Sequence, residues 1–279
     1  MIKDFIKQTI ELIESSDINI RQTEIRQVVF ENINGDYHSI VHIQAFSRYS
    51  GSKLSNNYIL QITIMFTLLD ALIDNKYPQF QGKTFSCKYR SLKGHDDDEI
   101  ILKQVFRIFK LLRNASVHSM GAIKYEKDAI TVSYVYHKTS YNMHITTYGL
   151  TLLFTFIMDI IKPLNHLTKK HHICLKRELY DEIKKEITTF NDEFGSKLPN
   201  ISNEKRLRRG LRYFVKNPDF KVVNNHIKIV SIYELDADTD AWRGVDYSIE
   251  YGSNQYMIPS ETLINGKIPI VDLLNWKLN

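Results

Sequence analysis

Four stretches of the chain repeat apolar residues every three or four positions, which is the spacing of helices. Residues 2–15 carry a one-sided apolar stripe, and residues 58–73 are apolar on almost every side, as in a buried helix. Residues 101–115 keep clear three-to-four spacing, and residues 148–161 form a fourth apolar stretch that a proline soon follows. The pattern predicts a bundle of helices in the first part of the chain.

Other stretches alternate apolar and polar residues, as strands do. Residues 130–136 and 141–145 alternate on either side of a polar turn, which predicts a β-hairpin inserted between two helices. Residues 17–50 are mixed: an Asn-Gly pair predicts a turn, and we expect a short helix followed by a loop. Residues 79–95 are expected to form a polar connection.

The composition changes at residues 165–172, which are rich in His and Lys. A helix rich in charged residues is predicted over residues 173–190 and a basic helix over residues 204–216. From about residue 220 onward, apolar and polar residues alternate as in strands. We therefore predict a mainly α protein. A helical domain with the β-hairpin insertion covers residues 1–165, and a smaller α+β domain with short antiparallel strands covers residues 166–279.

Composition narrows the function classes. The chain has 279 residues, 43% hydrophobic and 25% charged, which is typical of a globular protein. The longest apolar run, residues 150–161, is too short to span a membrane, and the N-terminus lacks the features of a signal peptide. We expect a cytoplasmic protein with free thiols at Cys87 and Cys174 and no membrane partner. The formal net charge of +5 permits binding to nucleic acid.

The strongest chemical signal is the segment RNASVH at residues 113–118, at the end of a predicted helix. Arg113 offers a planar, permanently charged fork for phosphate oxygens. His118 titrates near neutral pH and can move a proton. On a helix His118 lies four residues after Asn114, so the two project from nearly one face. The plainer alternative is a surface Arg, a helix-terminal Asn and a solvated His.

This segment resembles the signature of the HEPN superfamily (higher eukaryotes and prokaryotes nucleotide-binding domains). In that signature an Arg is followed by four to six residues, the first usually polar, and then by a His. Arg113, Asn114 and His118 fit the shortest spacing. The resemblance covers about the first 165 residues, where helices and a strand-rich excursion surround the motif. Met120 stands where a subgroup paired with nucleotidyltransferase antitoxins has Tyr, so the chain departs from that subgroup.

The resemblance implies a metal-independent endoribonuclease that needs no cofactor. Arg113 would hold the scissile phosphate, His118 would move a proton and Asn114 would orient either group. The resemblance also implies a homodimer in which two motifs face a shared cleft, and a toxin or phage-defence setting with an antitoxin or regulatory protein as a partner. The alternative is a catalytically inactive module that binds RNA or a protein.

A second feature is the basic stretch over residues 204–216. Its basic residues recur at helical spacing opposite an apolar stripe, and a one-sided basic helix can bind a phosphate backbone. We predict that this stretch binds the RNA that flanks the cleavage site. The alternative is that it is an ordinary solvated surface face. The residues are Lys205, Arg206, Arg208, Arg209, Arg212 and Lys216.

No metal site is predicted. The acidic run at residues 96–99 fits the first turn of a helix, where carboxylates complement the helix dipole. The histidines of residues 165–172 lack carboxylate or Cys partners at ligand spacing. The aspartates of residues 236–240 lack the Gly and Glu that a calcium loop requires.

Overall fold

A computed structural model describes most of the chain, and 45% of the protein is helix and 28% is strand. The strands form three sheets, one of them mixed, so the protein is α/β and the prediction of a mainly α fold is wrong. Among the strands that were missed, residues 211–216 pair with partners far away in the sequence, which local periodicity does not reveal, whereas residues 24–33 and 36–42 are neighbours along the chain and pair with each other. The described residues are 2–33, 36–42, 51, 53–55, 57–118, 120–164, 167–230, 232 and 243–278.

The chain divides into two compact units. Unit 1 comprises residues 1–21, 47–161 and 179–203, and unit 2 comprises residues 22–46, 162–178 and 204–279. The predicted division at residue 165 differs from this grouping in two places. An early segment belongs with the C-terminal part, and a late segment belongs with the N-terminal part.

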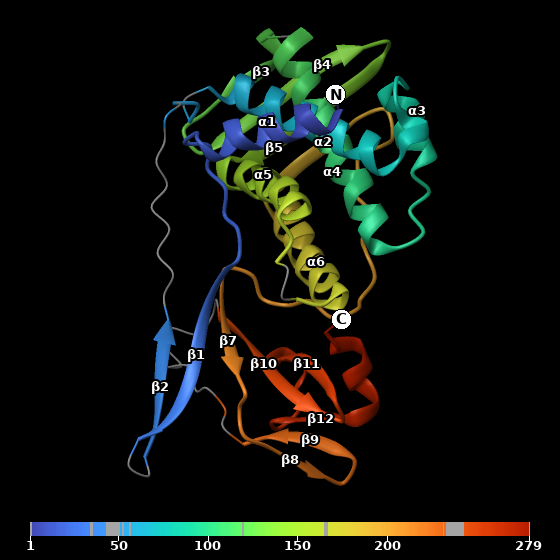
Figure 1. Cartoon of the computed structure of the whole chain (residues 1–279). Helices are drawn as coiled ribbons and strands as arrows, with labels where there is room; N and C mark the ends of the chain where they lie inside the picture. Colours follow the sequence, from blue (N-terminus) through green and yellow to red (C-terminus); the bar gives the residue numbers. More distant parts are fainter. Residues whose placement is uncertain are drawn as a thin grey trace. The chain divides into compact units, whose positions relative to one another are not determined.

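Unit 1 is built around helices, most of which were predicted by the apolar spacing (Figure 1). Helix α2 begins after Asn57, whose side chain accepts a hydrogen bond from the Leu60 N–H at 3.0 Å and so caps the helix. A short helix, α3, lies in the stretch expected to be a polar connection. The helices are α1 (Ile2–Glu14), α2 (Tyr58–Lys76), α3 (Phe85–Ser91), α4 (Asp97–His118) and α5 (Thr147–Ile161), with 3-10 turns η1 (Pro78–Phe80) and η2 (Met120–Ala122).

Helix α2 is long and apolar enough to cross a membrane by length and composition, which corrects the expectation that no apolar run reaches that length. Ile62, Met65 and Leu68 of this helix are fully buried within unit 1. The apolar character of α2 therefore matches its place at the centre of a core.

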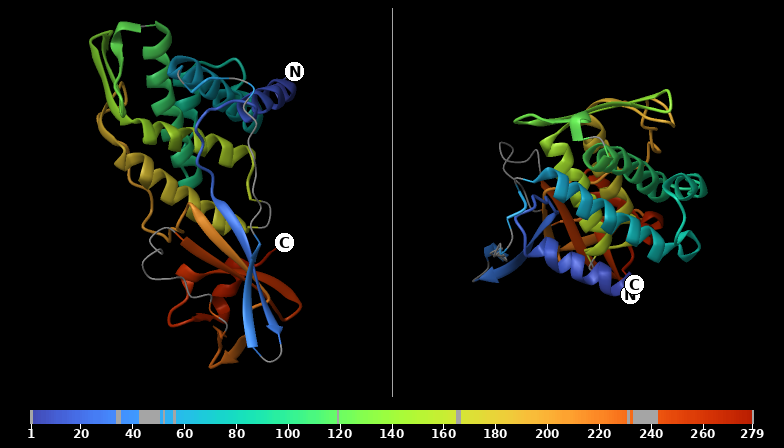
Figure 2. Two further views of the ribbon diagram at one scale, coloured as in Figure 1. Left: turned by 90° about the vertical axis from the view of Figure 1, so that its left-hand side faces the viewer. Right: turned by 90° about the horizontal axis from the view of Figure 1, so that it is seen from above.

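One antiparallel sheet completes unit 1, in the order β3-β4-β5-β6. Figure 2 shows this sheet along one side of the helices, and Ile130, Val132 and Met143 bury their side chains in the shared core. The predicted hairpin is confirmed; its turn is made by His137 and Lys138, both with positive φ. The strands are β3 (Ile123–Tyr125), β4 (Ala129–Tyr136), β5 (Thr139–Thr146) and β6 (Ile187–Asn191).

Unit 2 holds a five-stranded mixed sheet in the order β11-β10-β7-β1-β2. Its central strand β7 runs parallel to both β1 and β10, while β2 and β11 are antiparallel edges. Residues 17–50, where a short helix was expected, hold the first two strands instead. The strands are β1 (Glu24–Ile33), β2 (Asp36–His42), β7 (Leu211–Lys216), β10 (Arg243–Tyr251) and β11 (Asn254–Pro259).

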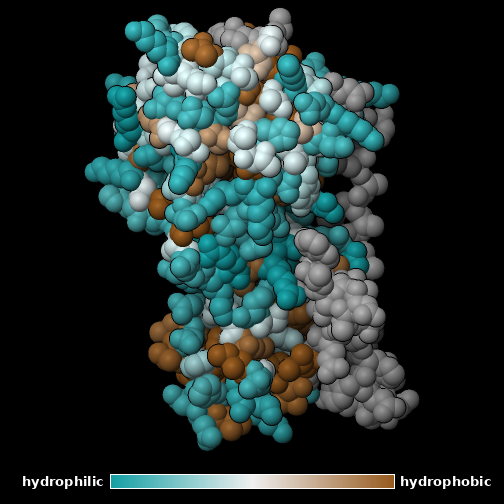
Figure 3. All heavy atoms as spheres, turned by 180° about the vertical axis from the view of Figure 1, so that it is seen from behind, coloured by the Kyte–Doolittle hydropathy of each residue, from teal (hydrophilic) through white to brown (hydrophobic). Residues whose placement is uncertain are grey.

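A smaller three-stranded sheet, in the order β12-β9-β8, packs apolar side chains into the hydrophobic core of unit 2. Several large apolar side chains of unit 2 face outward, and Figure 3 shows them as brown groups on its surface. Ile264, Val271 and Leu274 are the most exposed of these. The remaining elements are α6 (Lys169–Lys185), which contributes to both units, β8 (Phe220–Val223), β9 (His226–Ile229), β12 (Lys267–Pro269), η4 (Ser260–Thr262) and η5 (Ile270–Trp276).

Candidate functional site

Helix α4 carries the predicted motif in its last two turns and ends at His118, which confirms the expected placement. The helix is oriented by Phe109 and Leu112, whose side chains are fully buried in the core of unit 1. Because those residues face inward, Arg113 and Asn114 lie partly exposed at the helix surface. The apolar periodicity of α4 therefore positions the polar motif.

Arg113 and Asn114 contact each other directly. Arg113 Nη1 donates a hydrogen bond to Asn114 Oδ1 at 3.3 Å, and the guanidinium carbon lies 5.9 Å from the centre of the Phe66 ring. This cation–π contact helps to fix the guanidinium beside the amide. His118 is one helical turn beyond Asn114, and its side chain lies outside the described part of the structure.

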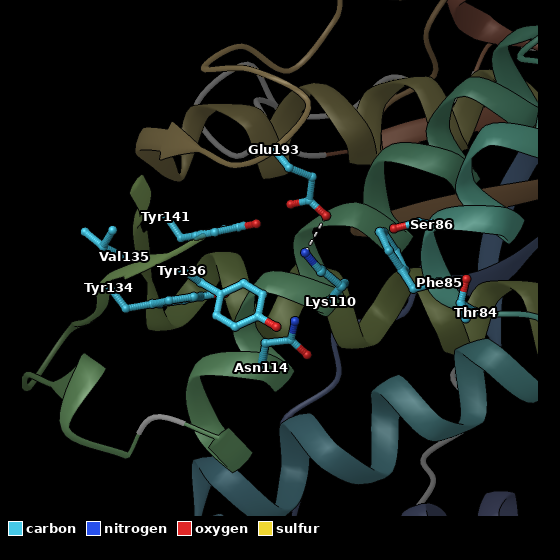
Figure 4. Close-up of a pocket in the computed structure, with 10 residues that line it drawn as sticks. All are labelled: Thr84, Phe85, Ser86, Lys110, Asn114, Tyr134, Val135, Tyr136, Tyr141 and Glu193. Atoms are coloured by element: carbon cyan, nitrogen blue, oxygen red, sulfur yellow. Dashed lines mark hydrogen bonds and ion pairs between the residues drawn. The ribbon is translucent and has the colours of Figure 1, made fainter. Parts of the chain in front are cut away.

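A pocket with a volume of about 760 Å³ opens beside Asn114 (Figure 4). Its walls come from the start of α3, the outer face of α4, the hairpin β4–β5 and the segment that follows β6. All of these belong to unit 1. The lining residues are Thr84, Phe85, Ser86, Lys110, Asn114, Tyr134, Val135, Tyr136, Tyr141 and Glu193.

A lysine and a glutamate face each other in this pocket. Lys110 Nζ lies 2.5 Å from Glu193 Oε1, and both side chains are largely buried. The same ammonium lies 5.0 Å from the centre of the Tyr141 ring and 5.4 Å from that of Phe85. The charge of Lys110 is therefore offset within the pocket wall.

Two tyrosines form a flat stack on the opposite wall. The ring centres of Tyr134 and Tyr141 are 4.7 Å apart and their planes differ by 4°. Burial raises the pKa of Tyr141 to about 12, and the nearby charge of Glu193 acts in the same direction. Burial also raises the pKa of Tyr134, although a hydrogen bond with Asn114 opposes the shift. Both hydroxyls therefore stay protonated at neutral pH and do not serve as general bases.

The segment that carries Glu193 is anchored to α4 one turn before Lys110. Asp192 is buried and accepts a hydrogen bond from Arg107 Nε at 2.7 Å and another from Arg107 Nη2. Arg107 also donates to the Gly195 carbonyl oxygen at 2.6 Å. This buried ion pair holds one wall of the pocket against the helix that carries the motif.

The basic stretch does not form the predicted helix. Residues 211–216 are strand β7, hydrogen-bonded between two parallel neighbours, so the expected basic face does not exist. Arg212 is fully buried: its Nε and Nη2 each lie 2.7 Å from an oxygen of Asp246, and its Nη1 lies 2.8 Å from Glu261 Oε1. Arg209 is also buried. Neither side chain presents its charge to an RNA backbone in this arrangement.

The other predicted RNA-binding residues lie on the loop before β7 and at its end. Lys205 is exposed and donates to the Glu261 carbonyl oxygen at 2.8 Å, while Arg206 donates to the Glu204 carbonyl oxygen at 2.5 Å. Arg208 and Lys216 are exposed. The helical spacing in the sequence therefore does not bring the six residues onto one surface.

Among the described residues, no group of three or more side chains could hold a metal ion. His171 is buried, with Nδ1 2.8 Å from the Thr168 hydroxyl and Nε2 3.4 Å from Asp246 Oδ1. Residues 165–166 and 233–242, which contain one candidate histidine and the aspartates of the supposed calcium loop, lie outside the described residues. Cys87 and Cys174 are free thiols.

Comparisons with protein families, with curated proteins and with solved structures found no match. The resemblance to the HEPN signature therefore rests on Arg113, Asn114 and His118 and on their helical setting.

Sequence reasoning missed the pocket, although part of its signal was present. Lys110, Asn114 and His118 recur every four residues, so they form one polar stripe along the helix. Nothing in the sequence indicated that Tyr134, Tyr141 and Glu193 would face this stripe. That arrangement depends on how the sheet packs against α4.

Proposed function

We propose that the chain is a metal-independent endoribonuclease whose reacting groups are Arg113, Asn114 and His118. The observation that supports this best is the position of Asn114. It contacts Arg113, shares a helix stripe with His118 and forms part of the wall of a pocket. A nuclease needs such an arrangement, because groups that act on a phosphate must lie next to a site that holds the rest of the nucleotide.

The proposed chemistry uses the 2′-hydroxyl of RNA. His118 accepts the proton of this hydroxyl, whose oxygen attacks the adjacent phosphorus, or delivers a proton to the departing 5′-oxygen. Arg113 stabilises the negative charge that develops on the phosphate oxygens. The P–O5′ bond breaks, leaving a 2′,3′-cyclic phosphate on one product and a 5′-hydroxyl on the other.

One chain provides one His and one Arg, whereas proton removal and proton delivery are two tasks. A homodimer that places two motifs in a shared cleft would provide both, as the HEPN resemblance implies. The same resemblance is the basis for proposing a toxin or phage-defence role with a regulatory partner. A catalytically inactive RNA- or protein-binding module is the second candidate, and the pocket beside Asn114 is equally available to it.

The test compares three substrates of one sequence in EDTA: RNA, 2′-O-methyl RNA and DNA. We expect cleavage of RNA alone, because the other two lack a reactive 2′-hydroxyl. Products ending in 2′,3′-cyclic phosphate would support the proposed chemistry. Cleavage of DNA, or dependence on a divalent metal, would contradict it. Binding of all three substrates without any cleavage would favour the inactive module.

A further inference from the structure

The pocket beside Asn114 has the size and charge of a site for an uncharged ring. Its volume of about 760 Å³ falls in the range of small-molecule sites, roughly 300–1,000 Å³. Among the described residues that line it, Lys110 is the one cation and Glu193 the one anion, and they pair at 2.5 Å. A phosphate placed here would face the Glu193 carboxylate, so the pocket favours a neutral group.

Aromatic rings provide most of the flat surface in the pocket. The side chains of Tyr134, Tyr136 and Tyr141 point from the hairpin towards α4, from which Lys110 and Asn114 point back (Figure 4). Tyr136 is 59% exposed, and its ring meets that of His137 edge-on with 4.1 Å between the ring centres. Unpaired nucleobases are commonly held by stacking on exposed aromatic side chains.

Polar groups in the pocket can read the edge of such a ring. The Asn114 amide carries both a donor and an acceptor, the combination that pairs with the edge of a base. The hydroxyl of Tyr134 hydrogen-bonds with Asn114 and that of Tyr141 with Glu193, so the two tyrosines hold the polar groups of the pocket in place. Thr84 and Ser86 place two more hydroxyls on the α3 wall.

The geometry points to a binding site for an unpaired nucleobase of single-stranded RNA in this pocket, with Tyr136 as the stacking residue and Asn114 at the base edge. This inference rests on the proposed function and deepens it. The base lies in the pocket while its phosphate extends along α4 towards Arg113. The predicted substrate is therefore a single strand, because a base paired in a duplex does not reach the pocket.

The test measures the affinity of the full chain for a fluorescent ten-nucleotide 2′-O-methyl RNA, which resists 2′-hydroxyl cleavage. We expect Tyr136→Ala to weaken binding roughly 5- to 150-fold, the effect of losing one stacked base, while Tyr136→Phe stays within about twofold of wild type. Tyr148→Ala is the matched control, because Tyr148 is 39% exposed and lies outside this pocket. It should bind as wild type does.

An abasic strand of equal length tests whether the Tyr136 ring contacts a nucleobase. If Tyr136 stacks on a base, Tyr136→Ala weakens binding of the complete strand and leaves binding of the abasic strand nearly unchanged. Equal losses on both strands, or no loss on either, would overturn the inference. Ring-dependent binding in a protein that leaves ordinary RNA intact would retain the base site and reject the ribonuclease. Cleavage of ordinary RNA, together with no effect of Tyr136→Ala on binding, would reject the base site and retain the ribonuclease.

Discussion

The buried ion pair between Arg107 and Asp192 provides a sharp test of how unit 1 is held together. Arg107 is 2% exposed and Asp192 is 4% exposed. The guanidinium donates two hydrogen bonds to Asp192 and one each to the carbonyl oxygens of Gly195 and Lys197. One side chain on α4 therefore bonds a buried carboxylate and two carbonyl oxygens of the segment that follows β6.

The perturbation is Arg107→Met, which keeps an unbranched apolar stem and removes the charge. Asp192 then remains buried without its cation, and the two carbonyl oxygens lose their donor. Breaking a buried ion pair by removing one partner costs about 3–5 kcal/mol of unfolding free energy. For a unit of this size, that loss corresponds to a fall in melting temperature of roughly 6–20 °C.

Thermal unfolding followed by circular dichroism measures the effect. The double variant Arg107→Met with Asp192→Asn should recover part of the loss, because it leaves no unpaired buried charge. Lys7→Met is the control, since the pair of Lys7 with Glu11 spans 3.9 Å between exposed side chains, and we expect no measurable change in melting temperature. A melting temperature of Arg107→Met within about 2 °C of wild type would show that the buried pair does not stabilise unit 1.

Two further predictions concern unit 2. Burial alone would raise the pKa of Asp246, but the charge and hydrogen bonds of Arg212 and His171 lower it below its ordinary value, about 3.9. The ionised Asp246 carboxylate therefore stabilises the fold fully above its unfolded-state pKa, and this contribution is lost as pH falls towards its folded-state pKa. Below about pH 4, the free energy of urea unfolding should therefore fall more steeply with pH in wild type than in Asp246→Asn. A Cβ at Gly244 would lie 2.2 Å from Arg212 Nη1, so Gly244→Ala should lower the free energy of unfolding by about 1–3 kcal/mol. Gly121→Ala, where the added Cβ meets nothing within 4 Å, should leave that free energy nearly unchanged, and equal effects of the two variants would contradict the packing.

The helices of unit 1 could be predicted because their burial follows from local spacing. In α4, Val105, Phe109 and Leu112 recur at three and four residues, and all three are fully buried. The hairpin was also predictable, because strands β4 and β5 are close in the sequence and alternate clearly. In each case the information lies in a window of roughly 11–18 residues.

The parallel pairings at the centre of the mixed sheet could not be predicted in this way. Strand β1 pairs in parallel with β7, where Arg26 lies opposite Tyr213, nearly two hundred residues later in the chain. The same problem misled the interpretation of residues 204–216. Arg212 resembles a surface cation in the sequence, yet Asp246 and Glu261 neutralise it inside unit 2. Helical spacing of charges does not distinguish a solvated face from a strand whose charged partner comes from another strand.

For the same reason, the sequence predicted the motif residues of the candidate site but not the pocket beside them. The motif residues Arg113 and Asn114 lie where the helix pattern placed them, partly exposed and in contact. The pocket is assembled by packing α3, α4 and the hairpin around one another, and Glu193 enters from the far end of unit 1 in sequence. Local motifs identify groups that can react, whereas tertiary packing decides what lies beside them.

The most direct test of the proposed ribonuclease is the rate of RNA cleavage in EDTA by purified wild type, His118→Ala and Arg113→Ala. We expect cleavage by wild type and losses of roughly 100-fold or more in both variants, because each removes a group that acts in the transition state. Cleavage by His118→Ala at the wild-type rate would contradict a mechanism in which His118 moves the proton.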